Sequence, residues 1–128
     1  KNGGKHPLFG IKDSVIVSDS MSFVAESNKE NLIGIDNQIH KNDVILTSTN
    51  IDYDELEVHD IVLYSNGEQE ICHRIVSKFI GDDGKQMLVT RGDANNTNDG
   101  AIEYTAIIGK VVDVIPNVGY VVTFLKSP

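Results

Sequence analysis

Short β-branched runs recur along the chain between polar, turn-forming breaks, and the periodicity of long helices is scarce. Two of the breaks, Asn66-Gly67 and Asp83-Gly84, are dipeptides that favour tight hairpin turns. The runs that are typical of strands are Ser14–Val17, Asp43–Ser48, Asp60–Tyr64, Glu70–Phe79, Met87–Thr90, Ile107–Ile115 and Gly119–Phe124. This spacing predicts a mainly β fold, an antiparallel sandwich or barrel with little helix.

The stretch 25–40 departs from this pattern. A polar segment, Glu26–Asn31, precedes the apolar residues Leu32–Ile35. This predicts a loop that contains a short turn of helix. No repeat, low-complexity tract or linker interrupts the sequence, so we expect residues 1–128 to form a single domain.

Composition narrows the function classes. The chain has 128 residues, of which 40% are hydrophobic, which is enough for a folded core. Its net charge is −8 and no basic stripe is present, which argues against binding of nucleic acid through phosphates. The single cysteine, Cys72, excludes a disulfide framework and argues against a thiolate metal cage. Its neighbour His73 should point to the opposite face of a strand, so the two make a poor catalytic pair.

The first candidate for chemistry is the end of the earliest predicted strand. The run Val15–Val17 stops at Ser18-Asp19-Ser20. Such a stretch is either a polar turn or a strand end that presents a nucleophile. A serine nucleophile needs a base within hydrogen-bond reach and donors for the oxyanion.

A base and an acid are available later in the chain. The four histidines are His6, His40, His59 and His73. Only His73 is flanked by apolar residues on a predicted strand, and the acidic loop Asp93–Asp99 follows the next strand. Serine, histidine and aspartate can form a triad in any chain order. From spacing alone, a histidine of the core and a loop with capping carboxylates remain alternatives.

The same loop has another interpretation. Asp93, Asn95, Thr97 and Asp99 place oxygen ligands at alternate positions, as a calcium loop does. The glycine and the glutamate of the EF-hand pattern are absent from it. A calcium-binding β module is therefore a distant alternative.

Five motifs in chain order resemble those of the type I signal peptidases of the endoplasmic-reticulum and archaeal kind. The family's Ser-Gly-Ser-Met-Glu-Pro stretch appears here as Ser-Asp-Ser-Met-Ser-Phe at 18–23, and its His-Arg-Ile-Val is intact at 73–76. The other matching segments are Lys41–Ile45, Val58–Val62, Arg91–Asn96 with Asp99, and Gly109–Val112 with Pro116–Tyr120. The resemblance covers nearly the whole chain and implies the β-rich catalytic fold of that family.

The resemblance implies a role for each matching residue. Ser20 would be the nucleophile and His73 the general base, as in the Ser-His branch of the family. Asp99 would orient His73, while Asp93 would support the loop or join the same network. The Ser20 backbone N–H and the Ser18 hydroxyl would form the oxyanion hole. Neither a metal nor a cofactor is implied.

The resemblance also implies a substrate and a place in the cell. Such enzymes are membrane-anchored serine endopeptidases that remove signal peptides from secretory precursors, cutting after small residues at positions −3 and −1. The substrate is bound as an added β-strand, and Met21, Ser22 and Phe23 would lie at its groove.

Membrane attachment is a further expectation. Flanking transmembrane segments are expected outside this chain, with the catalytic domain on the extracytoplasmic side of the cell membrane. An apolar rim that includes Phe9, Phe23 or Phe124 would face the lipid.

Three departures from the family pattern affect the site. Asp19 replaces glycine between the two serines, and Ser22-Phe23 replaces Glu-Pro. Met21 lies 22 positions before Asp43, more than in the family, which indicates an insertion at about 23–38. The insertion could narrow specificity, recruit a partner or block general substrates. It leaves open an alternative: an accessory protein that binds a dedicated client, for example a pilin precursor, and assists its assembly without general proteolysis.

Two further substitutions concern the backbone. The family's two Gly-Asp pairs at the start of strands become Asn42-Asp43 and His59-Asp60. Asparagine tolerates left-handed backbone geometry better than histidine does.

Overall fold

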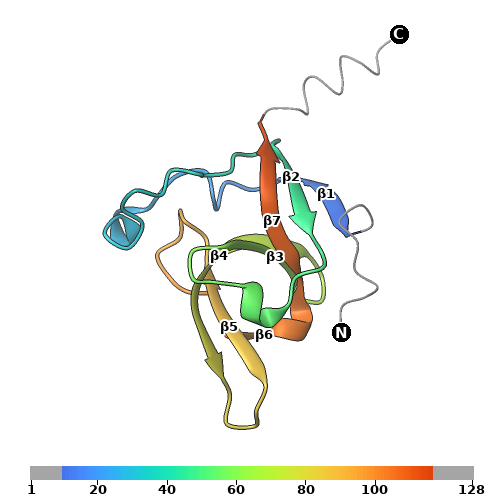
Figure 1. Ribbon diagram of the computed structural model, residues 1–128. Helices are drawn as coiled ribbons and strands as arrows, with labels where there is room; N and C mark the ends of the chain where they lie inside the picture. Colours follow the sequence, from blue (N-terminus) through green and yellow to red (C-terminus); the bar gives the residue numbers. More distant parts are fainter. Residues whose placement is uncertain (1–9, 117–128) are drawn as a thin grey trace.

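The computed structural model describes residues 10–116, and in it the alternating β-branched runs form one curled antiparallel sheet (Figure 1). The strands are β1 (Ile11–Val15), β2 (Val44–Ser48), β3 (Ile61–Ser65), β4 (Glu70–Ile80), β5 (Gln86–Arg91), β6 (Ile102–Glu103) and β7 (Ile107–Ile115). Three single 3₁₀ turns lie between them: η1 (Glu26–Asn28), η2 (Tyr53–Glu55) and η3 (Tyr104–Ala106). The mainly β prediction with little helix is confirmed. The predicted strand at Gly119–Phe124 lies outside the described residues, as do Phe9 and Phe124.

The sheet order is β1-β2-β7-β3-β4-β5-β6, and every neighbouring pair is antiparallel. Both predicted hairpins are present, joining β3 to β4 and β4 to β5. Gly67 and Gly84 have φ of 97° and 83° in these turns, values that glycine adopts without strain. The long β4–β5 hairpin extends away from the rest of the sheet (Figure 1).

The ends of the sheet were the least accurate predictions. The first strand was expected at 14–17, but β1 spans Ile11–Val15, because the polar residues Lys12 and Asp13 pair in register with β2. The short strand β6 was not expected, since two residues carry no period-2 pattern.

Two apolar clusters form the core, one on each side of β3. Ile61 and Leu63 belong to one cluster, and Val62 and Tyr64 belong to the other. Successive strand residues point to opposite faces, so the curled sheet buries both faces of β3. The next strand, β4, runs beside this buried strand and carries His73 opposite Val62.

The two substituted Gly-Asp pairs form similar turns before β2 and β3. Asn42 and His59 have φ of 76° and 84°, which lies in the left-handed region. In each turn the carboxylate of the following aspartate, Asp43 or Asp60, accepts a hydrogen bond from the backbone N–H three residues earlier, at 2.8 and 2.9 Å. The turns therefore keep the geometry that glycine would favour, with side chains present.

Candidate active site

Ser20 is held by its neighbour Met21, which anchors the turn after β1 in the core. The Met21 side chain is buried in one apolar cluster, and its sulfur accepts a hydrogen bond from the Asp93 backbone N–H at 3.3 Å. The Met21 carbonyl accepts a hydrogen bond from the Ile39 N–H at 2.8 Å. The side chain and the carbonyl of Met21 therefore both fix the backbone next to Ser20, whose own side chain is half-buried.

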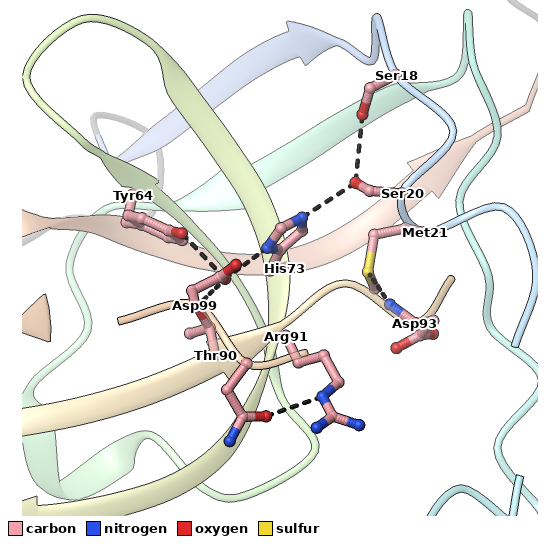
Figure 2. Close-up of polar contacts among 10 residues, drawn as sticks. Ser18, Ser20, Met21, Tyr64, His73, Thr90, Arg91, Asp93 and Asp99 are labelled. Atoms are coloured by element: carbon pink, nitrogen blue, oxygen red, sulfur yellow. Dashed lines mark hydrogen bonds and ion pairs between the residues drawn. The ribbon is translucent and has the colours of Figure 1, made fainter. Parts of the chain in front are cut away.

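Three side chains from distant parts of the chain form a hydrogen-bonded series (Figure 2). The Ser20 Oγ lies 3.1 Å from Nε2 of His73, and Nδ1 of His73 lies 2.6 Å from Oδ2 of Asp99. Because a carboxylate can only accept, Nδ1 carries the proton and Nε2 is free to accept one from Ser20. This is the arrangement that nucleophilic catalysis by serine requires.

Asp99 receives two further donors on the same oxygen. Thr90 donates its hydroxyl to Oδ2 at 2.6 Å, and the Tyr64 hydroxyl donates to it at 3.0 Å. Burial opposes ionisation of Asp99, but the hydrogen bonds from His73, Thr90 and Tyr64, with the charge of His73, outweigh it and lower the pKa of Asp99. Asp99 is therefore an oriented anion behind the imidazole.

Tyr64 is a donor that remains protonated. Burial is the main cause that raises its pKa to about 12, and the negative charge of Asp99 adds to it. Its ring also meets the His73 ring edge-on, with centroids 6.5 Å apart. Sequence reasoning assigned no role to Tyr64 or Thr90, because on strands they are common residues with no distinctive spacing.

The lowered pKa of Asp99 predicts a pH-dependent contribution to stability. An aspartate whose pKa is lower in the folded state stabilises the fold above its unfolded pKa, about 3.9, and this contribution disappears as the pH falls through the folded value. Urea unfolding should therefore show a stability gap between wild type and Asp99→Asn that is constant above about pH 5 and narrows as the pH falls below that value. Thr90→Val removes one donor to the Asp99 carboxylate, so the stability gap caused by Asp99→Asn should narrow less with pH when it is measured in the Thr90→Val background. A stability gap that does not change with pH would contradict the lowered pKa of Asp99 in the folded state.

Asp93 belongs to a different network from Asp99. Its carboxylate pairs with both Nε and an Nη of Arg74, at 2.9 and 2.8 Å, and accepts a hydrogen bond from Gln38 at 3.1 Å. In the part of the chain that the structure describes, the Asp93 carboxylate contacts Arg74 and Gln38, whereas His73 pairs with Asp99. Because Asp93 and Asp99 face different partners, they do not converge as the calcium interpretation requires, and the described residues contain no group of three metal-ligating side chains.

Ser18 lies beside the nucleophile candidate on the side away from His73 (Figure 2). The hydroxyl oxygens of Ser18 and Ser20 are 3.2 Å apart. Ser18 is exposed, so its hydroxyl can also reach a bound group.

A cavity of about 590 Å³ opens next to this site. Its walls come from the end of β1 and the start of β4, and we call it the β1–β4 groove. It is lined by Ser14–Ser18, Ser20, Met21, Leu63 and Gln69–His73. Of the three residues expected at the substrate groove, Met21 lines this cavity, whereas Ser22 and Phe23 do not. A second cavity of about 690 Å³ is lined by neither Ser20 nor His73, and it lies between the 28–32 segment and β4–β5.

Gly92 packs closely against both Ser20 and His73. A Cβ atom at this position would lie 2.8 Å from the Ser20 carbonyl oxygen and 2.9 Å from Nε2 of His73. No side chain fits there without displacing one of the two residues. The family-like segment Arg91–Asn96 contains this glycine, but its steric role was not evident from the sequence.

The segment 23–38, which the family pattern indicates as an insertion, does not line the β1–β4 groove. It contains the predicted short helical turn, η1, and extends from the sheet beside the loop that follows β5 (Figure 1). Its hydrogen bonds reach Asp93 and Asn95, as described below.

Cys72 lines the groove but is not a nucleophile. Burial raises the pKa of its thiol to about 12, so it stays protonated at neutral pH. It packs in the apolar cluster with Met21 and Leu63, as a small apolar residue does.

The chain is similar in sequence to curated signal peptidase subunits. It is 36% identical over 97 residues to the signal peptidase complex catalytic subunit SEC11 of Metarhizium acridum, which covers 68% of this chain and 56% of that protein. It is 41% identical over 83 residues to SEC11 of Pyricularia oryzae (57% and 48% covered), and 32% identical over 83 residues to that of Lachancea thermotolerans (56% and 49%). The chain therefore spans about half the length of these relatives. Among protein-family models, none matches it.

These similarities place the chain in the family of type I signal peptidases of the endoplasmic-reticulum type. Among the described residues, 10–116, no helix has the length and apolar character needed to span a membrane.

Proposed function

We propose that this protein is a serine endopeptidase that removes signal peptides from secretory precursors, with Ser20 as nucleophile and His73 as general base. The observation that carries the proposal is the continuous hydrogen-bonded series from Ser20 through His73 to Asp99 beside an open groove. The catalytic-subunit relatives support the same reaction class.

The proposed reaction follows from this geometry. The Ser20 Oγ attacks the scissile carbonyl carbon as His73 Nε2 takes the hydroxyl proton. The Ser20 backbone N–H and the Ser18 hydroxyl donate to the oxyanion. The tetrahedral intermediate expels the amine, which takes the proton from His73, and leaves an ester on Ser20. Water, deprotonated by His73, then hydrolyses the ester. Asp99 keeps the imidazole in the required tautomer throughout.

The β1–β4 groove suits an extended peptide. β1 is at the edge of the sheet and has β2 as its one partner strand in the described sheet, so the opposite edge of β1 can pair with a substrate strand. Val15, Val17 and Ile71 offer apolar contacts along its walls. We propose that small side chains at −1 and −3 fit there beside Ser20.

Membrane attachment is part of the proposal. Phe23 and Ile33 are exposed apolar side chains, 57% and 80% accessible, and they suit contact with a lipid surface. We propose that the domain acts at the cell membrane on its extracytoplasmic side.

The proposal is tested with a precursor that carries alanine at −3 and −1, mixed with the chain in detergent micelles. Mass spectrometry should find a single cut after position −1, and a lysine placed at −1 should reduce kcat/KM by about a hundredfold or more, because its long side chain would not fit a position that accepts small residues. Tight binding of the precursor without any cut would contradict the proposal and support the alternative of a client-binding accessory protein.

A further inference from the structure

The inserted segment makes its principal described contacts with the loop after β5. Ala25 donates its backbone N–H to the Asp93 carbonyl at 2.8 Å, and Gln38 donates to the Asp93 carboxylate at 3.1 Å. At the surface, Ser27 donates its hydroxyl to Asn96 at 2.9 Å. The segment thus packs on the back of the loop and not across the groove.

Asn28 is the buried centre of this contact. Its side-chain amide donates to the carbonyls of Asp93 and Asn95, at 2.9 and 2.7 Å, and its oxygen accepts from the Arg91 guanidinium. Asn28 is 3% exposed, so no water replaces these partners readily. One side chain therefore holds two residues of the loop and the last residue of β5.

The same loop contacts the reacting groups directly. The Ala94 backbone N–H donates to the Ser20 carbonyl at 2.9 Å. Gly92 lies against both Ser20 and His73 Nε2, at a spacing that leaves no room for a Cβ. A displacement of the loop by a few tenths of an ångström would therefore move Ser20 relative to His73.

We infer that Asn28 is a positioning residue, which sets the Ser20–His73 distance by holding the end of β5 and the following loop, residues 91–95, against both. This inference rests on the proposed peptidase function. It assigns the insertion a role that the sequence left open: the segment supports the site from behind, outside the groove.

The test is the steady-state kinetics of the full chain with the alanine precursor. Asn28→Ala should lower kcat about ten- to a hundredfold, because small misplacements of reacting groups are costly. KM should stay within about twofold, since Asn28 does not line the β1–β4 groove. Asn28→Asp should be at least as impaired: it keeps the oxygen that faces Arg91 but sets an oxygen against two carbonyls.

Two control variants separate positioning from a general loss of stability. Ser27→Ala removes the exposed contact of the same segment with the same loop, and should leave kcat within about twofold. Tyr53→Phe removes a half-buried hydroxyl that donates to the carbonyls of Phe79 and Met87, at 3.0 and 2.7 Å, away from the site. It should lower Tm by a similar amount to Asn28→Ala and leave kcat unchanged.

The outcomes are distinct. If wild type cleaves and Asn28→Ala has the wild-type kcat, the inference fails while the proposed function stands. A loss that appears in KM alone, or an equal loss of kcat in Tyr53→Phe, also overturns it. If wild type does not cleave, the proposed function fails, and the positioning role of Asn28 fails with it.

Discussion

Ser20→Ala and His73→Ala should each lower kcat by about 10⁴- to 10⁶-fold on the alanine precursor, with KM little changed. Ser20 supplies the atom that forms the covalent bond, and His73 lies 3.1 Å from it as the acceptor of its proton. Without either group, the remaining catalysis comes from the oxyanion donors and the bound geometry alone.

The double variant Ser20→Ala/His73→Ala should be no slower than either single variant, since the two residues act as a unit. Asp99→Asn should lose about 10⁴-fold, because an amide in place of the carboxylate permits the wrong tautomer of His73. Thermal unfolding serves as the control: the Ser20→Ala variant should keep the wild-type Tm to within a few degrees. Near-wild-type cleavage by either single variant would refute the assignment of nucleophile and base.

The second large effect concerns stability. Arg74→Ala should lower the free energy of unfolding by about 3–5 kcal/mol, because it leaves the carboxylate of Asp93 buried without its cation. Arg74 and Asp93 are both 2% exposed, and Arg74 also donates to the His59 carbonyl and to Asn37. The paired groups join β4 to the loop and to the inserted segment, so their loss removes contacts among all three.

Urea unfolding measures this effect. Replacing both partners with apolar residues, as in Arg74→Met/Asp93→Leu, should cost less than Arg74→Ala, since no unpaired charge remains. Lys12→Ala is the matched surface control: it breaks the exposed ion pair with Glu70 and should cost at most about 1 kcal/mol. An Arg74→Ala variant as stable as Lys12→Ala would show that the buried pair does not support the fold.

The strands near the middle of the sheet could be predicted because their patterns are strong. β4 and β7 are long runs with many β-branched residues, β3 is a short run of apolar residues, and Gly67 and Gly84 mark the hairpin turns. β1 could not be placed correctly, because three of its five residues are polar and its pairing with β2 decides its limits. The local sequence pattern predicts the limits of a strand poorly where pairing with a neighbouring strand determines them.

The candidate site was predictable in part. The motif resemblance picked out Ser20, His73 and Asp99, and the structure brings their side chains together. The resemblance could not decide whether Asp93 or Asp99 pairs with His73. In the structure His73 pairs with Asp99, and the next residue on β4, Arg74, pairs with Asp93. Adjacent strand residues point to opposite faces, and this choice of partner is not visible in the sequence. The place of the insertion was also not predictable, since its buried anchor is a single asparagine in a polar segment.

The most direct test of the account is to trap the acyl intermediate. The chain is mixed with a peptide thioester that ends in alanine, quenched with acid within the first turnover, and mapped by mass spectrometry of its fragments. The account predicts an acyl group on Ser20 in wild type and in Asp99→Asn at a lower rate, and none in Ser20→Ala. Precursor cleavage by wild type with the acyl group on another residue, or with no acyl group on Ser20, would contradict it.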